Sequence, residues 1–253
     1  MCATCGCGTD ETRMTVLNHG HTHDHPHDQP HEHPRDPPSG DRTHTLELEV
    51  AVLARNDERA ERNRAWLAER SVTALNLMSS PGAGKTTLLE RTVAELDRPV
   101  TVIEGDQETL LDADRIRRAG ARAVQVNTGA GCHLDAAMVA RALEELQPEE
   151  SSALFIENVG NLVCPAMFDL GERRRVVIIS VTEGDDKPLK YPHMFAAADL
   201  VLVNKTDLLP YVDFDPGRLT SDARRLNPGV EVLSLSARTG AGCGAWMDWL
   251  TTI

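Results

Sequence analysis

The sequence lacks the positive charge that a non-specific nucleic-acid binder needs. Its 253 residues include 39 Asp and Glu against 26 Lys and Arg, a formal net charge of −13, whereas nucleic-acid binding requires a basic face. The sequence also lacks any apolar run near the ~20 residues of a membrane-spanning helix, and its first residues contain no apolar signal region. We therefore predict a cytoplasmic protein that inserts into no membrane and binds no nucleic acid.

Three of the six cysteines, Cys2, Cys5 and Cys7, lie at the very start of the chain. In a reducing compartment such cysteines indicate metal ligands or free thiols rather than disulfides. A C-x-x-C pair brings two sulfurs to one ion, and soft thiolates suit Ni²⁺, Zn²⁺ or Cu⁺. Removal of the initiator Met would add the Cys2 α-amine as a fourth ligand of a square-planar, nickel-like site. The alternative is a redox-active C-x-x-C, but such motifs normally begin a helix beside a βαβ unit, so the position at the chain end favours metal.

Residues 11–45 form a low-complexity segment rich in His, Asp and Pro. So little of it can be buried that we predict disorder. Neutral imidazoles bind Ni²⁺, Zn²⁺ and Cu²⁺, so the segment is a candidate store of several ions. A solvated linker that binds metal only incidentally is an alternative, whereas irregular spacing and interleaved acids argue against a purification tag. The histidines are His19, His21, His23, His25, His27, His31 and His33, and His44 follows.

The chain is predicted to divide into a tail, residues 1–45, and an α/β domain, residues 46–253. Apolar residues at helical spacing over 45–70 predict one or two amphipathic helices that pack on the domain. Beyond them, continuous Val, Ile and Leu runs indicate strands covered on both faces. We therefore predict a doubly wound, mostly parallel sheet with its site at the strand carboxyl ends. The expected strands are 74–78, 100–103, 121–126, 153–156, 176–181, 200–203 and 230–235, and the expected helices include 88–93, 134–146 and 246–250.

A glycine-rich turn joins the first strand to the helix that follows it. It reads Ser79-Ser80-Pro81-Gly82-Ala83-Gly84-Lys85-Thr86-Thr87, and a strand, a Gly-rich turn, Lys-Thr and a helix form the context of a phosphate-binding loop. Backbone N–H groups at the helix N-terminus would hold the phosphates. Lys85 would reach the β- and γ-phosphates, and the Thr86 hydroxyl would bind Mg²⁺. The usual pattern has Gly at the position of Ser79, so the domain is predicted to be a P-loop NTPase with a variant loop.

Two motifs after later strands indicate guanine as the base. Asn204-Lys205-Thr206-Asp207 follows a strand and resembles the N-K-x-D motif of GTPases. The Asp207 carboxylate would accept the N1 and 2-amino protons of guanine, which adenine does not offer in that arrangement. Ser236-Ala237-Arg238 ends the last strand and resembles the S-A-K element whose backbone N–H contacts guanine O6.

Acidic residues at two strand ends are candidates for Mg²⁺ binding. Glu157-Asn158-Val159-Gly160 resembles D-x-x-G with Glu for Asp, so Glu157 would hold Mg²⁺ through water and the Gly160 N–H would meet the γ-phosphate. Asp106, at the end of the second strand, either lies on the Mg²⁺ side or caps a turn. No Gln or Arg is clearly placed for catalysis, so intrinsic hydrolysis should be slow. The predicted catalytic residues are Lys85, Thr86, Asp106, Glu157 and Gly160.

Cys132, His133 and Cys164 are candidates for a second metal site. Cys132 and His133 precede a helix, and Cys164 follows Gly160 by four residues. Both stretches leave strand carboxyl ends, so the three side chains should form one N/S site, completed by the same residues of a second subunit. Taken singly, each would be a buried Cys or a capping His, but three soft ligands on two loops favour metal. Cys243 has no partner in sequence and is expected to be structural.

Together these motifs resemble those of the hydrogenase nickel-incorporation GTPases, the HypB family of SIMIBI-class P-loop GTPases. The resemblance covers nearly the whole chain, and Ser79 itself belongs to the family's pattern. It rests on Cys2-x-x-Cys5-Gly6-Cys7, the phosphate loop Ser79–Thr86, the Cys132-His133 pair, Glu157-Asn158-Val159-Gly160-Asn161-Leu162-Val163-Cys164-Pro165 and Asn204-Lys205-Thr206-Asp207.

The resemblance implies a GTP-dependent homodimer that hydrolyses GTP to GDP, with a nickel-binding N-terminus and a second Ni²⁺ or Zn²⁺ site in the GTPase domain. It also implies delivery of nickel to the large subunit of [NiFe]-hydrogenase, with the nickel chaperone HypA as a partner. Two alternatives stay open. One is a urease-accessory GTPase of the UreG type, against which the N-terminal cysteines argue. The other is a nickel storage and detoxification protein in which GTPase activity is secondary.

Overall fold

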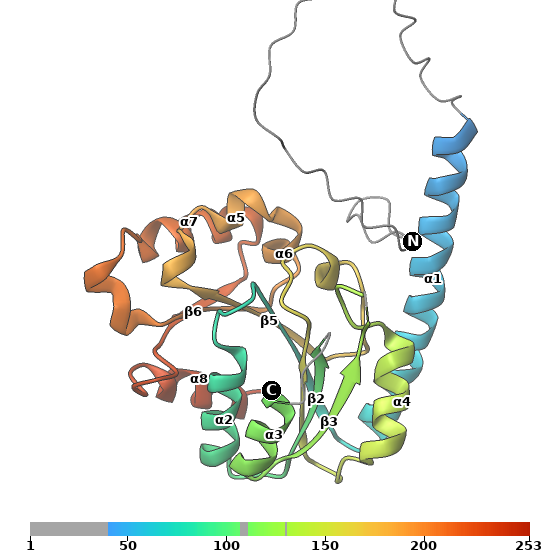
Figure 1. The fold of residues 1–253 in the computed structure, drawn as a ribbon, viewed down its shortest axis with the longest axis horizontal. Coiled ribbons are helices and arrows are strands. Elements are labelled where there is room, and N and C mark those ends of the chain that lie inside the picture. The colour runs from blue at the N-terminus through green and yellow to red at the C-terminus, as the bar shows by residue number, and fades with distance from the viewer. Residues whose placement is uncertain (1–39, 107–110, 130) are drawn as a thin grey trace, which may run out of the picture. The chain divides into compact units, whose positions relative to one another are not determined.

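The computed structural model describes residues 40–106, 111–129 and 131–253. The chain divides into two compact units, Met1–Ala51 and Val52–Ile253, and the sheet lies in the second of them (Figure 1). Among the described residues, no helix is both long enough and apolar enough to cross a membrane.

A seven-stranded sheet forms the centre of the second unit, in the order β3-β2-β4-β1-β5-β6-β7. Every pair of neighbouring strands is parallel, which confirms the predicted doubly wound sheet. Each expected strand is present, with small shifts at its ends. The strands are β1 (Thr73–Ser79), β2 (Val100–Asp106), β3 (Arg122–Asn127), β4 (Ala153–Glu157), β5 (Arg174–Ser180), β6 (Leu200–Asn204) and β7 (Glu231–Ser234).

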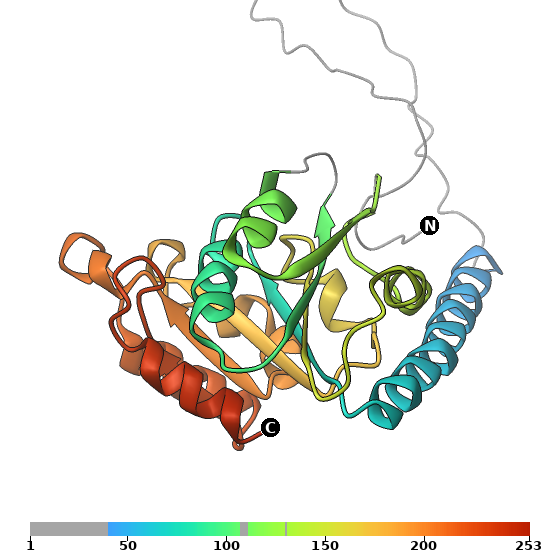
Figure 2. The ribbon, with the colours of Figure 1, turned by 90° about the horizontal axis from the view of Figure 1, so that it is seen from below.

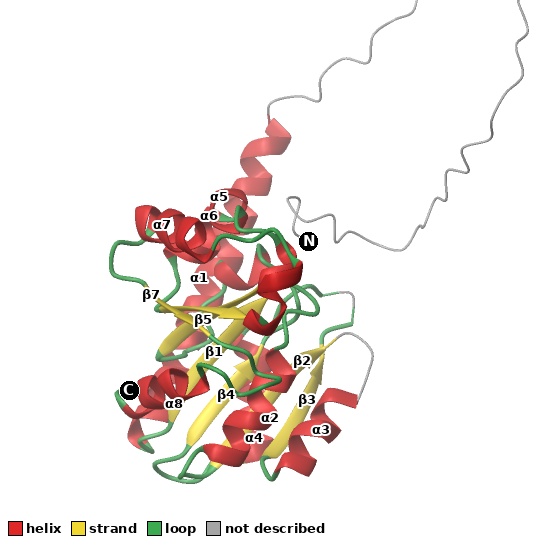
Figure 3. Ribbon diagram, turned by 90° about the vertical axis from the view of Figure 1, so that its left-hand side faces the viewer, coloured by secondary structure: helices red, strands yellow, loops and turns green. Residues whose placement is uncertain are grey.

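Helices cover both faces of the sheet (Figures 2 and 3). The first helix is continuous, where the sequence predicted one or two helices over residues 45–70. Its part from Val52 onward belongs to the second unit, where the Asn63 side chain donates to the carbonyls of Ala136, at 2.9 Å, and Leu170, at 3.0 Å. The helices are α1 (Gly40–Glu69), α2 (Lys85–Glu95), α3 (Leu111–Ala119), α4 (Ala136–Leu146), α5 (Lys187–Lys190), α6 (Pro192–Ala196), α7 (Pro216–Leu226) and α8 (Cys243–Thr251).

Alternate residues of the strands face different hydrophobic clusters. Leu75 and Leu77 of β1 pack with α2, α3 and α8 on one face of the sheet. Ala74 belongs to a cluster with α1 and α4, and Met78 to one with α6 and α7. Because both faces of β1 are covered, every residue of the strand is buried, and this explains why its apolar residues do not alternate with exposed polar ones in the sequence.

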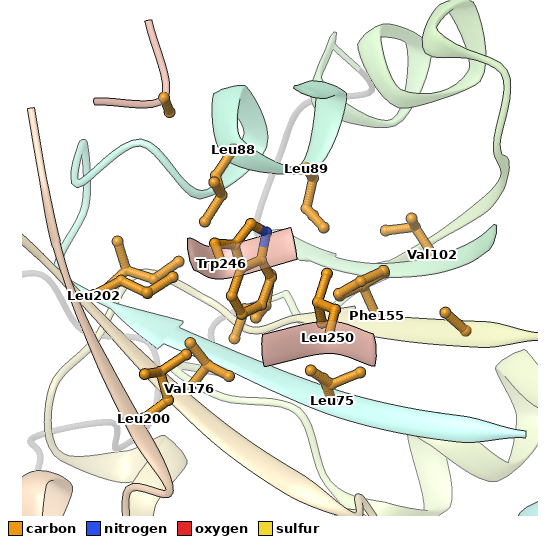
Figure 4. Packing of buried hydrophobic residues seen from close by; sticks show 14 of the residues in the cluster. Leu75, Leu88, Leu89, Val102, Phe155, Val176, Leu200, Leu202, Trp246 and Leu250 are labelled. Atoms are coloured by element: carbon orange, nitrogen blue, oxygen red, sulfur yellow. The ribbon is translucent and has the colours of Figure 1, made fainter. Parts of the chain in front are cut away.

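Trp246 of α8 fills the middle of the first cluster (Figure 4). Its side chain is 1% exposed, and its indole N–H donates to the Thr92 hydroxyl of α2 at 2.9 Å. An indole N–H is tolerated in a core when it finds such an acceptor. This contact joins the closing helix to the helix that carries the phosphate loop.

The carboxyl ends of the central strands meet at one edge, because parallel strands all end on the same side of a sheet. The register pairs Glu157 of β4 with Leu77 of β1 on one side and with Glu104 of β2 on the other. The phosphate loop, the Glu157 loop and the Asp106 strand end therefore lie side by side, as the sequence required.

Candidate functional site

A cavity of about 540 Å³ opens at this edge of the sheet. The phosphate loop forms one wall, and the ends of β2 and β4 form the opposite wall. Several of its residues were predicted from the sequence, whereas Glu104, Asp112, Arg115 and the side chain of Asn158 were not assigned a role. The lining residues are Pro81, Gly82, Gly84, Lys85, Thr86, Thr87, Glu104, Gly105, Asp106, Asp112, Arg115, Glu157, Asn158, Val159, Gly160 and Lys205.

Two glycines shape the phosphate loop. Gly82 and Gly84 have positive φ angles of 74° and 99°, which residues with a Cβ rarely adopt. A Cβ at Gly84 would also lie 2.6 Å from the Asn204 amide nitrogen. The loop therefore requires glycine at position 84 both for its backbone conformation and for its close approach to β6.

Lys85 is held inside the loop. Its ammonium group donates to the Ser79 hydroxyl at 2.8 Å, so the serine at the unusual first position of the motif is a direct partner of the lysine. Lys85 is 8% exposed. Burial lowers the pKa of Lys85, while the nearby carboxylates of Glu157 and Asp112 oppose that shift. A phosphate group at this position would further favour the charged form.

Thr86 and Glu157 form an oxygen-rich corner of the cavity. The Thr86 hydroxyl donates to Glu157 Oε1 at 2.9 Å, whereas Glu157 Oε2 is buried with no hydrogen-bond partner. Burial raises the pKa of Glu157 to about 7, although Lys85 and the Thr86 hydroxyl oppose the shift. A hydroxyl beside a carboxylate with an unsatisfied oxygen suits a hard cation such as Mg²⁺.

Glu104 is a second buried carboxyl group in the same wall. It is 2% exposed, and its Oε2 has no hydrogen-bond partner. Burial raises the pKa of Glu104 to about 8, with a further contribution from the neighbouring charge of Glu157. A glutamate directly after the run Val100–Ile103 was the sequence signal that could have identified it.

Asp106 and Gly160 also border the cavity. Asp106 is the last residue of β2, and its carbonyl accepts a hydrogen bond from the Thr128 N–H at 3.0 Å. Gly160 lies so close to the phosphate loop that a Cβ at this position would come within 2.9 Å of Pro81 Cα. Both residues thus border the same cavity as the phosphate loop.

The predicted base-recognition motifs are joined to the phosphate loop. The Asn204 amide donates to the Ala83 carbonyl at 2.8 Å and accepts from the Ala237 N–H at 3.0 Å. The Lys205 ammonium donates to the Gly82 carbonyl at 2.6 Å. These bonds connect three segments that are far apart in the sequence.

Asp207 lies beside the last loop, where its carboxylate accepts from the Ser236 hydroxyl at 2.6 Å. Arg238 is exposed. Neither Asp207 nor residues 236–238 line the cavity described above, which is the phosphate end of the candidate site. Cys243 is buried beneath this loop, where its thiol donates to the Ser236 carbonyl at 3.6 Å, in agreement with its predicted structural role.

Cys132, His133 and Cys164 come together as the sequence predicted. The sulfurs of Cys132 and Cys164 are 2.9 Å apart, and Cys132 Sγ lies 3.6 Å from His133 Nδ1. One ligand atom from each residue lies within 4.8 Å of the others. Two sulfurs and an imidazole form a donor set that suits Ni²⁺ or Zn²⁺.

The His133 ring is oriented by Phe168, on which it stacks with a centroid distance of 3.9 Å and an interplanar angle of 27°. Burial lowers the pKa of His133, and the Asp135 carboxylate opposes the shift only in part. The neutral imidazole is the form that binds metal, so the surroundings favour a ligand rather than a cation.

Arg115 lines the cavity, and no other arginine among the described residues does so. Its guanidinium pairs with Glu90 at 2.6 Å and Asp112 at 3.0 Å, and donates to the Thr87 hydroxyl at 3.2 Å. No motif surrounds it in the sequence. Its place in the cavity comes only from the packing of α3 against α2.

The predicted N-terminal ligands Cys2, Cys5 and Cys7 lie outside the described residues. The same is true of the predicted metal store, His19, His21, His23, His25, His27, His31 and His33.

Comparison with known proteins identifies the relatives of the chain. Residues 73–234 match the family described as "CobW/HypB/UreG, nucleotide-binding domain". The chain is 57% identical over 215 residues to the hydrogenase maturation factor HypB of Rhizobium leguminosarum bv. viciae, covering 84% of this chain and 72% of that protein. It is 56% identical over 217 residues to HypB of Escherichia coli K12, covering 85% and 75%.

Two crystal structures have a similar fold. HypB from Helicobacter pylori in complex with nickel superposes with a TM-score of 0.76 at 39% identity, covering 78% of this chain and 94% of that one. HypB from Archaeoglobus fulgidus superposes with a TM-score of 0.74 at 41% identity, covering 79% and 98%.

Proposed function

Because the chain belongs to the HypB family of hydrogenase maturation factors, we propose that it is a nickel-binding GTPase that delivers nickel to the large subunit of [NiFe]-hydrogenase. One observation carries this proposal. Cys132, His133 and Cys164 bring their ligand atoms within 4.8 Å of one another, and Cys164 lies four residues beyond Gly160 of the cavity. Metal and nucleotide would therefore be held by adjoining loops.

GTP would bind with its phosphates on the N–H groups of Gly82–Thr87 and its base beside Asn204–Asp207 and residues 236–238. Lys85 would move its ammonium from Ser79 to the β- and γ-phosphates, since its present partner is a neutral hydroxyl. Asp207 would accept the guanine N–H groups with the lone pairs that Ser236 leaves unused.

Thr86 and Glu157 would hold the Mg²⁺ ion that accompanies GTP, with Asp106 on the same side of the cavity. Their fit rests on the 2.9 Å contact and on the unsatisfied Glu157 Oε2. Mg²⁺ bound there would neutralise charge on the phosphate oxygens. The carboxylate must be ionised for this purpose, so a pKa near 7 makes cation binding pH-dependent.

Nickel is the proposed cargo of the Cys132–His133–Cys164 site, which could also take Zn²⁺. Three ligands leave at least one position of a four-coordinate ion open. The same residues of a second copy would complete the site in a GTP-dependent homodimer. A site that shares ligands between two copies would release its metal when the dimer opens, and the nickel chaperone HypA is the proposed exchange partner.

Hydrolysis to GDP would reset the site. We expect a low intrinsic rate, because the arginine of the cavity wall is already paired with Glu90 and Asp112 and would have to leave them to reach a phosphate. The reaction is proposed to occur in the cytoplasm, and a partner protein would have to accelerate it.

The N-terminal cysteines and histidines are proposed to bind nickel before its transfer. Deleting residues 2–45 separates delivery from storage. A delivery role predicts loss of hydrogenase maturation at limiting nickel, whereas a storage role predicts loss of nickel tolerance with maturation intact.

The central test compares nickel affinity of the domain site in two nucleotide states. In the full chain with Cys2, Cys5 and Cys7 replaced by Ser and the histidines of residues 19–44 replaced by Asn, nickel is titrated in the presence of Mg²⁺ with GDP or with a non-hydrolysable GTP analogue. We expect the two dissociation constants to differ by about fivefold or more, the usual range of coupling between sites.

The controls use two other cysteines. Cys164→Ser should abolish nickel binding by the domain site, whereas Cys243→Ser, at a buried thiol away from the site, should leave it intact. Equal affinity in both nucleotide states would show that the metal site does not respond to GTP.

A further inference from the structure

Asn158 lies between the nucleotide cavity and the loop that joins β3 to α4 and carries Cys132 and His133, which we call the metal-binding loop after its proposed role. It directly follows β4, lines the cavity and is 1% exposed. Its backbone N–H donates to the Leu77 carbonyl of β1 at 3.0 Å, which extends the β1–β4 pairing by one residue. The backbone of Asn158 is therefore fixed to the centre of the sheet, and its side chain can form hydrogen bonds with the loops on either side.

One oxygen of this side chain holds both loops. Asn158 Oδ1 accepts from the N–H of Val159 at 3.0 Å and from the N–H of Leu134 at 3.1 Å. Val159 precedes Gly160 of the cavity wall, and Leu134 follows His133 of the metal site. A single acceptor thus connects the segment that faces the phosphates to the segment that carries two metal ligands.

The orientation of the Asn158 amide is set by a chain of buried polar side chains. Asn158 Nδ2 donates to Asn76 Oδ1 at 3.2 Å, and Asn76 Nδ2 donates to Glu172 Oε1 at 3.3 Å. Glu172 accepts in turn from the Arg175 guanidinium at 2.7 Å. Since an amide cannot flip without losing these bonds, the oxygen of Asn158 must point toward the loops.

Gly105 allows the metal-binding loop to reach Asn158. The sheet order places β2 between β3, which leads into this loop, and β4. Leu134 packs over the end of β2, where a Cβ on Gly105 would lie 2.7 Å from Leu134 Cγ. Leu134 itself is fully buried. A shift of the Leu134 backbone would therefore change both its hydrogen bond to Asn158 and its packing on the end of β2 that carries Asp106.

We propose that Asn158 is a positioning residue that couples the nucleotide state to the geometry of the metal site. If Gly160 moves to meet a γ-phosphate, Val159 moves with it. The shared oxygen then follows Val159 and strains its bond to the Leu134 N–H. Because Leu134 directly follows His133, this strain changes the position of His133 relative to Cys164. This inference rests on the proposed function, because it names the residue through which that function is regulated.

The test is the nickel titration in the two nucleotide states, repeated with Asn158→Ala. We expect the ratio of the two dissociation constants to fall from about fivefold or more in the parent chain to less than about twofold in the variant. Because coupling is reciprocal, the effect of nickel on the affinity for the GTP analogue should shrink by the same factor.

The matched control is Thr92→Val, which also removes a buried hydrogen-bonding group. Thr92 is fully buried and bonds to Trp246 and to the Leu88 carbonyl, away from both sites. This variant should keep the parent ratio. A ratio of one in the parent chain would refute the coupling between nucleotide and metal that the proposed function includes. A parent ratio that survives in Asn158→Ala would refute only the role of Asn158.

Hydrogen exchange on the unmodified chain gives a second measurement that does not depend on folding of the variant. The Leu134 and Val159 amides share one acceptor, so their protection should change together when GDP is exchanged for the GTP analogue. Nickel binding should also change the protection of Val159, although Val159 touches no metal ligand in the described contacts. A Leu134 amide that exchanges at the same rate in both nucleotide states would overturn the inference.

Discussion

Replacing Glu157 by Gln should stabilise the protein while removing the proposed Mg²⁺ binding. The Glu157 carboxyl is buried, and burial raises its pKa from 4.5 to about 7. That difference disfavours the ionised carboxylate in the folded state by roughly 3 kcal/mol. The folded state holds this proton more tightly than the unfolded state, so the free energy of unfolding falls as pH rises from about 4.5 to about 7. The loss is complete above pH 7.

Gln keeps the oxygen that accepts from Thr86 and carries no charge at any pH. At pH 5 the carboxyl of the folded wild type is still mostly protonated and only a small part of its stability has been lost, so the two proteins should differ much less than at pH 8. At pH 8 the Glu157→Gln variant should be more stable by roughly 1–3 kcal/mol, the lower figure allowing for an amide N–H₂ left without a buried partner. Wild-type affinity for Mg²⁺ with GTP should rise through pH 7, and the variant should lose it.

The assay is urea denaturation of the nucleotide-free and metal-free full chain at pH 5 and pH 8, together with GTP binding in the presence of Mg²⁺. Glu145→Gln is the matched control, because Glu145 is exposed on α4; it should change neither quantity. If the stability difference between Glu157→Gln and wild type were the same at both pH values, burial of this carboxylate would not be the cause.

Two further substitutions test the base site and the core. Asp207→Asn removes the carboxylate that would accept two guanine N–H groups, so GTP binding should weaken about 10- to 100-fold with no gain in ATP binding. Competition between the two nucleotides measures this, and unchanged GTP affinity would contradict the assignment of Asp207 to the base. Trp246→Ala empties the centre of the largest cluster and should lower the free energy of unfolding by about 3–5 kcal/mol in urea denaturation, whereas Tyr211→Ala, at a side chain that is 82% exposed, should cost less than about 0.5 kcal/mol.

The strands could be predicted because each is covered on both faces. Runs such as Val176–Ile179 are fully buried, and a short continuous apolar run rich in β-branched residues is typical of a strand inside a parallel sheet. Helices α3 and α7 were not predicted. α3 reads Leu-Asp-Ala-Asp-Arg-Ile-Arg-Arg-Ala, in which Ala113 and Ile116 are the apolar residues known to be buried. Two buried apolar residues form so narrow an apolar stripe that the helical periodicity of this part of the sequence is weak.

The candidate metal triad was predictable because its members follow two strands that end at the same edge. The connection through Asn158 was not. A single asparagine after an acidic residue resembles part of the D-x-x-G motif, and only the fold shows that its oxygen reaches Leu134. Ser79 was visible in the sequence as a departure from the usual loop, but its bond to Lys85 depends on the curvature of the loop.

The bonds from Asn204 to the Ala83 carbonyl and from Lys205 to the Gly82 carbonyl fix the two ends of the nucleotide site against each other before a ligand arrives. Such preorganisation reduces the conformational entropy that binding would otherwise cost. Because the protein also sets the spacing between the base and phosphate positions, the site should select ligands by length. The contributions of base and phosphates to the free energy of binding should then be non-additive, so that removing one end of the ligand alters the contribution of the other end.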